Sequence, residues 1–241
     1  MTLIAGIILP KGILMVSDSR EQIEITDEVH NEYKRKITMV TPTNILGSAG
    51  FSTTFCAAQI LRQTLFKNNA KFTSQEIRRY ILEFYQHVNL LHLVGRDPSQ
   101  PVGQILLAEL DLKDEKYCLL SNYGIDRFKN FTIYNKVKDV VLIGAHHEIR
   151  NSAKQQIQYV LDSLDENSLN LSYIYEPISL ACHKIFKDLS VIYNGINDKL
   201  YCVYISTIEG KPSSSFYFLE SDGSDHRIDE HQDGEIISYT R

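Results

Sequence analysis

Residues 1–20 read MTLIAGIILPKGILMVSDSR, and this stretch decides how the rest of the chain is organised. Two apolar runs flank Pro10, Lys11 and Gly12, which supply the fixed φ and the positive φ that a tight hairpin turn needs. We therefore predict two paired antiparallel strands. The second run continues directly into residues 17–20, SDSR, so it places charge at the end of a buried strand, where charge is costly unless it is paired or used.

The same stretch is a poor signal peptide or membrane span. No positively charged segment precedes its apolar run, as a secretory signal requires. Pro10, Lys11 and Gly12 interrupt that run far short of the length that spans a bilayer. No later stretch reaches that length without charges. We therefore expect no membrane segment and a cytoplasmic protein.

Composition narrows the function classes further. The net charge of −5 argues against a nucleic-acid partner, which would usually require a basic surface. The 4 cysteines form no Cys-x-x-Cys pair, which argues against a zinc or redox site and fits a reducing compartment. His146 and His147 are adjacent at a predicted strand end and should face opposite ways, so we predict no metal site there. No cofactor is predicted either. His226 and His231 in the polar tail could bind a cation together with the acidic residues around them. A flexible, solvated tail explains these residues equally well.

The elements predicted from periodicity and turn residues come in blocks. Strands up to Gly50 are followed by two helices, then strands, then two more helices, then closing strands. The first helix should start near Ser52 or Thr53, where hydroxyls are available to cap it, and the second opens with a Thr73–Glu76 capping box. The later strands and helices are expected at 102–110, 116–121, 131–134, 139–143, 149–164, 177–189, 199–207 and 215–220.

Paired helices disfavour parallel β-α-β winding. They favour the α+β class, with two antiparallel sheets packed face to face and each covered outside by a helix pair, a four-layer αββα sandwich. We predict one domain over residues 1–220 and a polar, loosely ordered tail over 221–241.

Thr2 suggests a chemistry because it follows Met1 directly. Removal of Met1 would leave a hydroxyl and a free α-amine on the same residue. A threonine hydroxyl is a weak nucleophile that needs an adjacent base, and an α-amine with a pKa near 8 can serve as one. The alternative is that Thr2 is only the first residue of a strand.

Several motifs in order resemble the proteasome β-subunit family of N-terminal-nucleophile (Ntn) hydrolases, as a divergent bacterial or archaeal member. The resemblance extends to about Leu219, and that family has the four-layer αββα fold. The motifs that carry it are Thr2 with residues 12–20, Lys36-Ile37, Gly47-Ser48-Ala49-Gly50, Leu110-Asp111 with Tyr123-Gly124, residues 141–144 and Lys187-Asp188.

The resemblance implies roles for five residues. Thr2 would be the nucleophile and Lys36 would lower the pKa of its amine, while Asp18 would keep Lys36 charged and aimed. The Gly50 N–H would stabilise the oxyanion, and Asp188 would hold the amine. Each also has a structural explanation, such as an ion pair between Asp18 and Arg20 or a turn glycine before a helix. The specificity pocket would be lined by small polar side chains, namely Ser48, Ser52 and Cys56, with Glu21 and Lys34 at its mouth.

The implied activity is a threonine-type protease or peptidase, an amide hydrolase acting on peptides or unfolded proteins. It would work as a homo-oligomer in a ring or helical assembly, and an ATPase partner is left open. Two departures support a rival, an inactive assembly scaffold: Ala145 and Val191 stand where the family has serines. Retention of Met1 would also favour the scaffold. Transpeptidation by the same acyl-enzyme is a third possibility.

Overall fold

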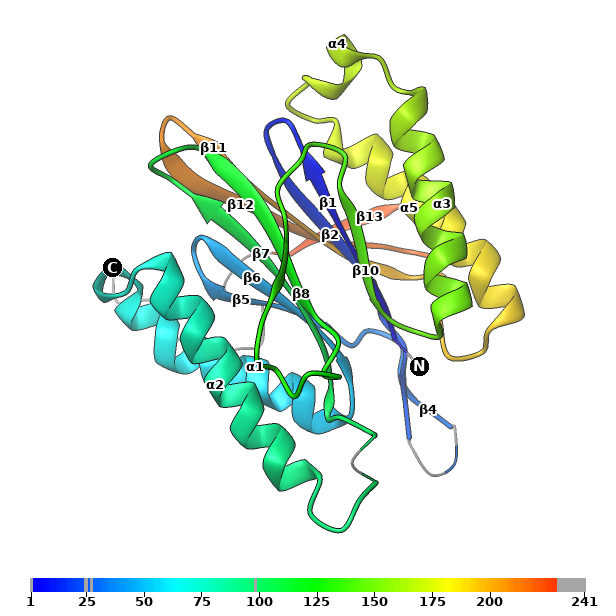
Figure 1. Cartoon of the computed structure of the whole chain (residues 1–241). Helices are drawn as coiled ribbons and strands as arrows, with labels where there is room; N and C mark the ends of the chain where they lie inside the picture. Colours follow the sequence, from blue (N-terminus) through cyan, green and yellow to red (C-terminus); the bar gives the residue numbers. More distant parts are fainter. Residues whose placement is uncertain (1, 24–25, 27, 98, 229–241) are drawn as a thin grey trace.

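The computed structural model describes residues 2–23, 26, 28–97 and 99–228. The fold is mixed α+β, and every strand pair among these residues is antiparallel, as predicted. One sheet has six strands in the order β10-β1-β2-β11-β12-β13, another has five in the order β5-β6-β7-β8-β9, and β3 and β4 form a small separate pair. Figure 1 shows the two large sheets between two sets of helices.

The bounds agree closely with the periodicity of the sequence. The strands are β1 (Leu3–Leu9), β2 (Gly12–Asp18), β3 (Glu21–Gln22), β4 (Val29–Asn31), β5 (Ile37–Thr41), β6 (Asn44–Gly50), β7 (Gly103–Asp111), β8 (Lys116–Asn122), β9 (Thr132–Tyr134), β10 (Val140–Gly144), β11 (Leu200–Ile208), β12 (Lys211–Leu219) and β13 (Asp225–Ile228). The helices are α1 (Ser52–Leu65), the 3-10 helix η1 (Phe66–Lys71), α2 (Ser74–His92), α3 (His147–Ser163), α4 (Glu166–Leu169) and α5 (Tyr175–Ile192).

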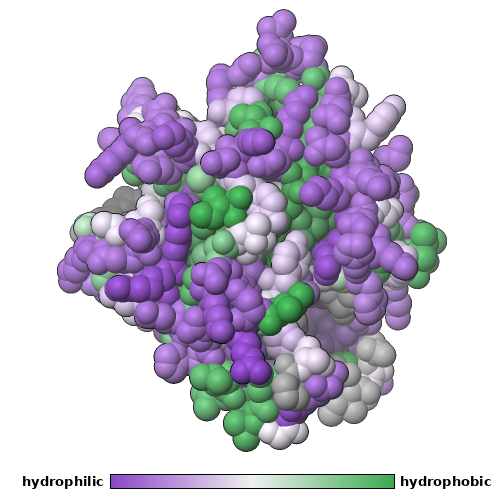
Figure 2. All heavy atoms as spheres, in the orientation of Figure 1, coloured by the Kyte–Doolittle hydropathy of each residue, from purple (hydrophilic) through white to green (hydrophobic). Residues whose placement is uncertain are grey.

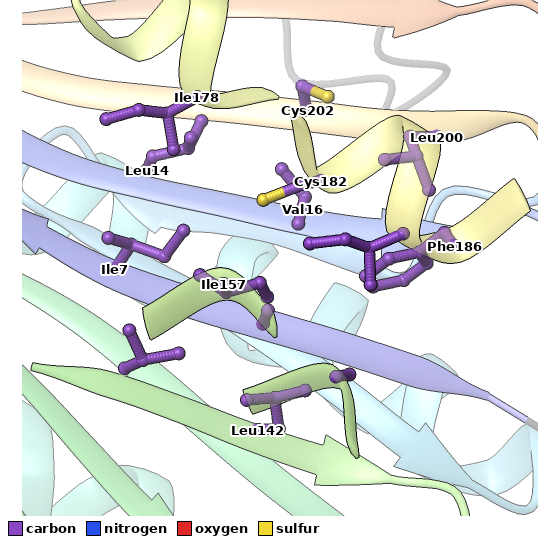
Figure 3. Packing of buried hydrophobic residues seen from close by; sticks show 14 of the residues in the cluster. Ile7, Leu14, Val16, Leu142, Ile157, Ile178, Cys182, Phe186, Leu200 and Cys202 are labelled. Atoms are coloured by element: carbon purple, nitrogen blue, oxygen red, sulfur yellow. The ribbon is translucent and has the colours of Figure 1, made fainter. Parts of the chain in front are cut away.

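Three apolar clusters hold these elements together. The first joins β1, β2, β10 and β11 to α3 and α5, and Figure 3 shows Ile157 and Phe186 of these helices against the sheet. The second lies between the two large sheets, and the third joins the five-stranded sheet to α1 and α2. β1 contributes Leu3 and Ile7 to the first cluster and Ile4 to the second. Because both faces of β1 are buried, its sequence is a continuous apolar run rather than an alternating one.

The hairpin between β1 and β2 forms as predicted, but Gly12 has a different role in it. Gly12 pairs with Leu9 inside the ladder and is not in the positive-φ region. A Cβ on Gly12 would lie 2.4 Å from the carbonyl oxygen of Ile205 and 2.5 Å from the ring of Tyr204. The glycine is therefore required for space between β2 and β11, not for turn geometry.

The two helix starts that we predicted differ in how they are capped. α2 has the full capping box between Thr73 and Glu76. α1 begins at Ser52 as predicted, but its N-cap residue is Phe51, and no side chain caps it. The hydroxyl of Thr54 in its first turn donates instead to the carbonyl of Val102, at 2.6 Å. The hydroxyl cap expected for α1 is therefore wrong.

The prediction of a loosely ordered tail from residue 221 is wrong for its first part. Residues 225–228 form β13, which pairs with β12 and buries Ile228 in the cluster between the sheets. Residues 229–241, with the rest of the predicted tail and His231, lie outside the described residues. No helix in the described part of the chain is long and apolar enough to cross a membrane. The face in Figure 2 is largely hydrophilic, with an apolar patch at the end of α2.

The close contact at Gly12 predicts that a larger residue there destabilises the fold. Gly12→Ala should lower the free energy of unfolding by about 2 kcal/mol, because the new methyl group must displace strand backbone. Gly210→Ala is the control: Gly210 has a φ of 73° but nothing within 4 Å, so only the backbone strain of about 1 kcal/mol applies. Urea unfolding measures both, and a smaller cost for Gly12→Ala than for Gly210→Ala would contradict the steric argument.

Candidate active site

Asp18 and Lys36 form a fully buried ion pair at the ends of two strands from different sheets. The Lys36 ammonium donates to Oδ2 of Asp18 at 2.7 Å, and the two side chains are 1% and 0% exposed. The other oxygen, Oδ1, accepts the backbone N–H of Leu3 at 2.7 Å. Asp18 thus links the first residue of β1 to the residue that precedes β5.

The Lys36 ammonium is less stable in its buried position than it would be in water. Burial lowers the pKa of Lys36, and the attraction and hydrogen bond of Asp18 act in the opposite direction. A buried ion pair costs several kcal/mol of desolvation per ion unless its geometry and hydrogen bonds compensate. Asp18 meets this condition because it accepts from an ammonium and a backbone amide.

Thr2 is buried and lies where two cavities meet. One cavity of about 630 Å³ is also lined by Lys36 and Gly50, and continues to Glu21 and Phe55. A second, of about 310 Å³, is lined by Thr2 and Gly50 together with Pro101, Gly103, Gln104, Gly144 and Ala145. A chain bound across Thr2 would therefore have space on both sides of it.

The end of β10 holds the backbone of Thr2. The N–H of Ala145 donates to the Thr2 carbonyl at 2.6 Å. Gly144 has a φ of 90°, and a Cβ there would lie 1.9 Å from that carbonyl oxygen. Arg150 on α3 donates from Nη1 to the carbonyls of both Gly144 and Ala145, at 2.6 Å each. Backbone contact thus fixes Thr2 where the resemblance led us to expect a serine side chain.

Gly50 borders both cavities and has a φ of 137°, a conformation that side chains rarely adopt. A Cβ at this position would lie 2.5 Å from the Cα of Gly103. The next residue, Phe51, donates its N–H to the carbonyl of Val102 at 3.1 Å. The position beside Thr2 therefore requires glycine both for its conformation and for space.

The predicted pocket residues are only partly brought together. Ser52 and Glu21 line the larger cavity, and the ammonium of Lys34 is 3.1 Å from the Glu21 carboxylate. Ser48 is buried away from it, with its hydroxyl 3.2 Å from that of Tyr85. Cys56 is exposed on α1 and does not line the cavity. Ser48 on β6 and Cys56 on α1 are therefore not pocket residues, because their side chains lie on faces of these elements that do not border the cavity.

Aromatic side chains that the sequence reasoning missed complete the larger cavity. Phe51 and Phe55 line it, and the ammonium of Lys34 lies 5.9 Å from the centroid of the Phe55 ring. The signal was present in the sequence, since one helical turn from the predicted Ser52 reaches Phe55. The cavity is therefore more apolar than three small polar residues would make it.

The structure does not bring Asp188 to the cavities that Thr2 borders. Asp188 lies on the exposed face of α5, and no contact to a described residue joins it to the site. The chain reaches the end of β2 only after α5 has ended: Asn197, which is 1% exposed, accepts the N–H of Ser19 at 2.9 Å. Asn194 accepts from Nη1 of Arg20 at 2.6 Å through its carbonyl. The sequence reasoning missed this segment because nothing local marks these asparagines.

The adjacent histidines lie in a different element from the one that we predicted. His146 occupies the N-cap position of α3, and His147 is its first residue, so the pair lies at a helix start and not a strand end. Within the described residues, no group of three His, Cys, Asp or Glu side chains is placed to hold a metal ion.

No protein-family model and no curated protein matches the sequence of this chain. The interpretation of the site therefore depends on its own geometry.

Asp18 is buried and Asp188 is exposed, so the same substitution should affect the stability of the fold differently at the two positions. Asp18→Asn should lower the free energy of unfolding by about 3 to 5 kcal/mol, because it leaves the buried Lys36 ammonium without a counter-charge. Asp188→Asn removes an exposed carboxylate and should change it by less than about 0.5 kcal/mol. Urea denaturation measures both variants. Equal effects would show that the buried pair does not hold this end of the fold together.

Proposed function

We propose that the protein is an N-terminal-threonine amide hydrolase, similar to proteasome β subunits, in which Thr2 becomes the nucleophile after removal of Met1. The observation that carries the proposal is that Thr2 shares a cavity with Lys36, whose ammonium is held by Asp18. Asp18 at the same time fixes the backbone next to Thr2. Met1 lies outside the described residues, so its removal is part of the proposal.

The proposed reaction proceeds through an ester. The Thr2 hydroxyl attacks the substrate carbonyl carbon, and its proton passes to the free α-amine of the same residue, which acts as general base. The C–N bond breaks as the amine returns the proton to the leaving nitrogen. Water then attacks the ester, with the same amine as base, and frees the threonine. The positive charge of Lys36 lowers the pKa of the α-amine and stabilises the developing alkoxide.

Gly50 is the candidate donor for the oxyanion. It lies beside Thr2 at the junction of the two cavities, and its conformation admits only glycine without strain. One hydrogen-bond donor aimed at the developing charge is worth about 3–4 kcal/mol where it has been removed by mutagenesis. These positions support the role for Gly50.

The proposal includes the Ntn-hydrolase fold, a four-layer αββα sandwich. It is supported by the three apolar clusters, which follow the order helices, sheet, sheet and helices. Membership of the proteasome β-like family as a divergent bacterial or archaeal member, a cytoplasmic location and assembly as a homo-oligomer in a ring or helix come from the resemblance and stay predictions. The substrates in this proposal are peptides or unfolded proteins, whose extended chains fit cavities on both sides of Thr2.

An inactive assembly scaffold is the second candidate. It is favoured by the exposed position of Asp188, which leaves the α-amine without the carboxylate that we expected from α5. Under this alternative, Met1 stays in place and Thr2 remains an ordinary strand residue. The buried Asp18–Lys36 pair would then serve only to join the sheets.

The intact mass of the native protein after incubation with a peptide β-lactone separates the two candidates. The peptidase proposal predicts loss of Met1 and one covalent adduct. The adduct should be absent in Thr2→Ala and present in the control Thr53→Ala, which removes an exposed hydroxyl at the start of α1. An unmodified protein that retains Met1 would overturn the proposal, and so would an adduct that persists in Thr2→Ala.

A further inference from the structure

A third cavity lies next to the site, and its two cations, unlike those that line the larger cavity, have no acidic partner among the described residues. It has a volume of about 480 Å³ and lies between β10 and the first turns of α3. Tyr123, Tyr134 and the apolar residues of β10 supply much of its wall. Its basic groups come from α3, where His147, Arg150 and Lys154 follow one another at helical spacing on the same face.

The charge of this cavity is one-sided. Arg150 and Lys154 both line it, and its described lining contains no Asp or Glu. Neither cation forms an ion pair with any acidic residue in the described part of the chain. The chain as a whole has a net charge of −5, whereas this cavity carries two cations without acidic partners beside an apolar wall. The cavity is therefore positively charged on an acidic protein. A positively charged cavity with low-dielectric walls attracts anions.

The cavity adjoins the cavity of about 310 Å³ that Thr2 borders. Pro101 and Gln104 line both this cavity and the cavity of about 310 Å³ that Thr2 borders. Arg150 also donates to the carbonyls of Gly144 and Ala145, and the N–H of Ala145 binds the carbonyl of Thr2. A chain that crosses Thr2 on this side therefore runs from the small cavity towards the two cations.

We propose that this cavity is a second substrate subsite, which binds a carboxylate of the peptide on the side of Thr2 opposite the Phe55 cavity. Arg150 and Lys154 supply the charge, and the tyrosines supply apolar contact for the adjoining part of the peptide. The carboxylate comes either from an acidic side chain or from the C-terminus of a short peptide. The inference rests on the proposed function, since it names the class of substrate for the same site.

The test uses Lys154, because Arg150 also supports the loop at Thr2. Binding is measured in the Thr2→Ala protein with a short peptide carrying an aminobenzoyl fluorophore. The peptide is prepared with a free or amidated C-terminus, and with an internal Glu or Gln. We expect the carboxylate form to bind about two- to fivefold more tightly at low salt, in the range of exposed charge pairs. The preference should become smaller at high salt, because salt screens exposed charges.

Matched variants assign the preference to the cavity. Lys154→Glu should abolish it and Lys154→Arg should keep it. Lys184→Glu, a charge reversal on the exposed face of α5, should also keep it. The affinities of the peptides also identify the source of the carboxylate. A preference for the free C-terminus over its amide indicates a terminal carboxylate, and a preference for Glu over Gln indicates an acidic side chain. Equal affinity of the acid and neutral peptides, or a preference that survives Lys154→Glu, would overturn the subsite.

Cleavage of the same peptides by the native protein separates this inference from the proposed function. Cleavage with no difference between acid and neutral peptides would overturn the subsite and leave the hydrolase intact. Absence of cleavage, together with a Lys154-dependent binding preference, would overturn the hydrolase and support the anion site.

Discussion

The site depends on one buried ion pair, between Asp18 and Lys36. Two charges removed from water are stable only when each has a full set of partners. Asp18 has an ammonium on one oxygen and the N–H of Leu3 on the other. The pair therefore fixes the end of β2, the approach to β5 and the start of β1 relative to one another. This arrangement places a cation beside the second residue of the chain.

The surroundings of Thr2 are built mainly from backbone. Gly50 and Gly144 both have positive φ values and both meet other backbone atoms where a Cβ would be. Arg150 holds the carbonyls of Gly144 and Ala145, so a charged side chain supports the loop that contacts Thr2. Such close backbone packing leaves little room for Thr2 to move, while the cavities on either side leave room for a substrate.

Local sequence signals predicted most of the fold. Neighbouring residues decide the apolar period of α2, its capping box and the hairpin around Pro10. These features could therefore be predicted from the sequence. The meeting of Thr2, Lys36 and Gly50 was expected from the resemblance, since no local pattern brings together residues this far apart in the chain.

Features that depend on packing between distant segments could not be predicted. Gly12 is required because Tyr204 and the Ile205 carbonyl lie against it, although it follows a proline and a lysine like a turn glycine. Asp188 was assigned to the site from its place in a motif, but α5 presents it to solvent. The segment after the helix supplies the buried Asn197 instead. The basic cavity likewise forms only when α3 packs beside β10.

The most direct test of the account is a double-mutant cycle on the ion pair. The free energy of unfolding is measured for Asp18→Asn, Lys36→Met and the double variant. If the pair organises this region, each single change leaves a buried group without its partner, and the double variant is at least as stable as the less stable single variant, with a coupling of about 2 kcal/mol or more. Costs that simply add would contradict the central role of the Asp18–Lys36 pair.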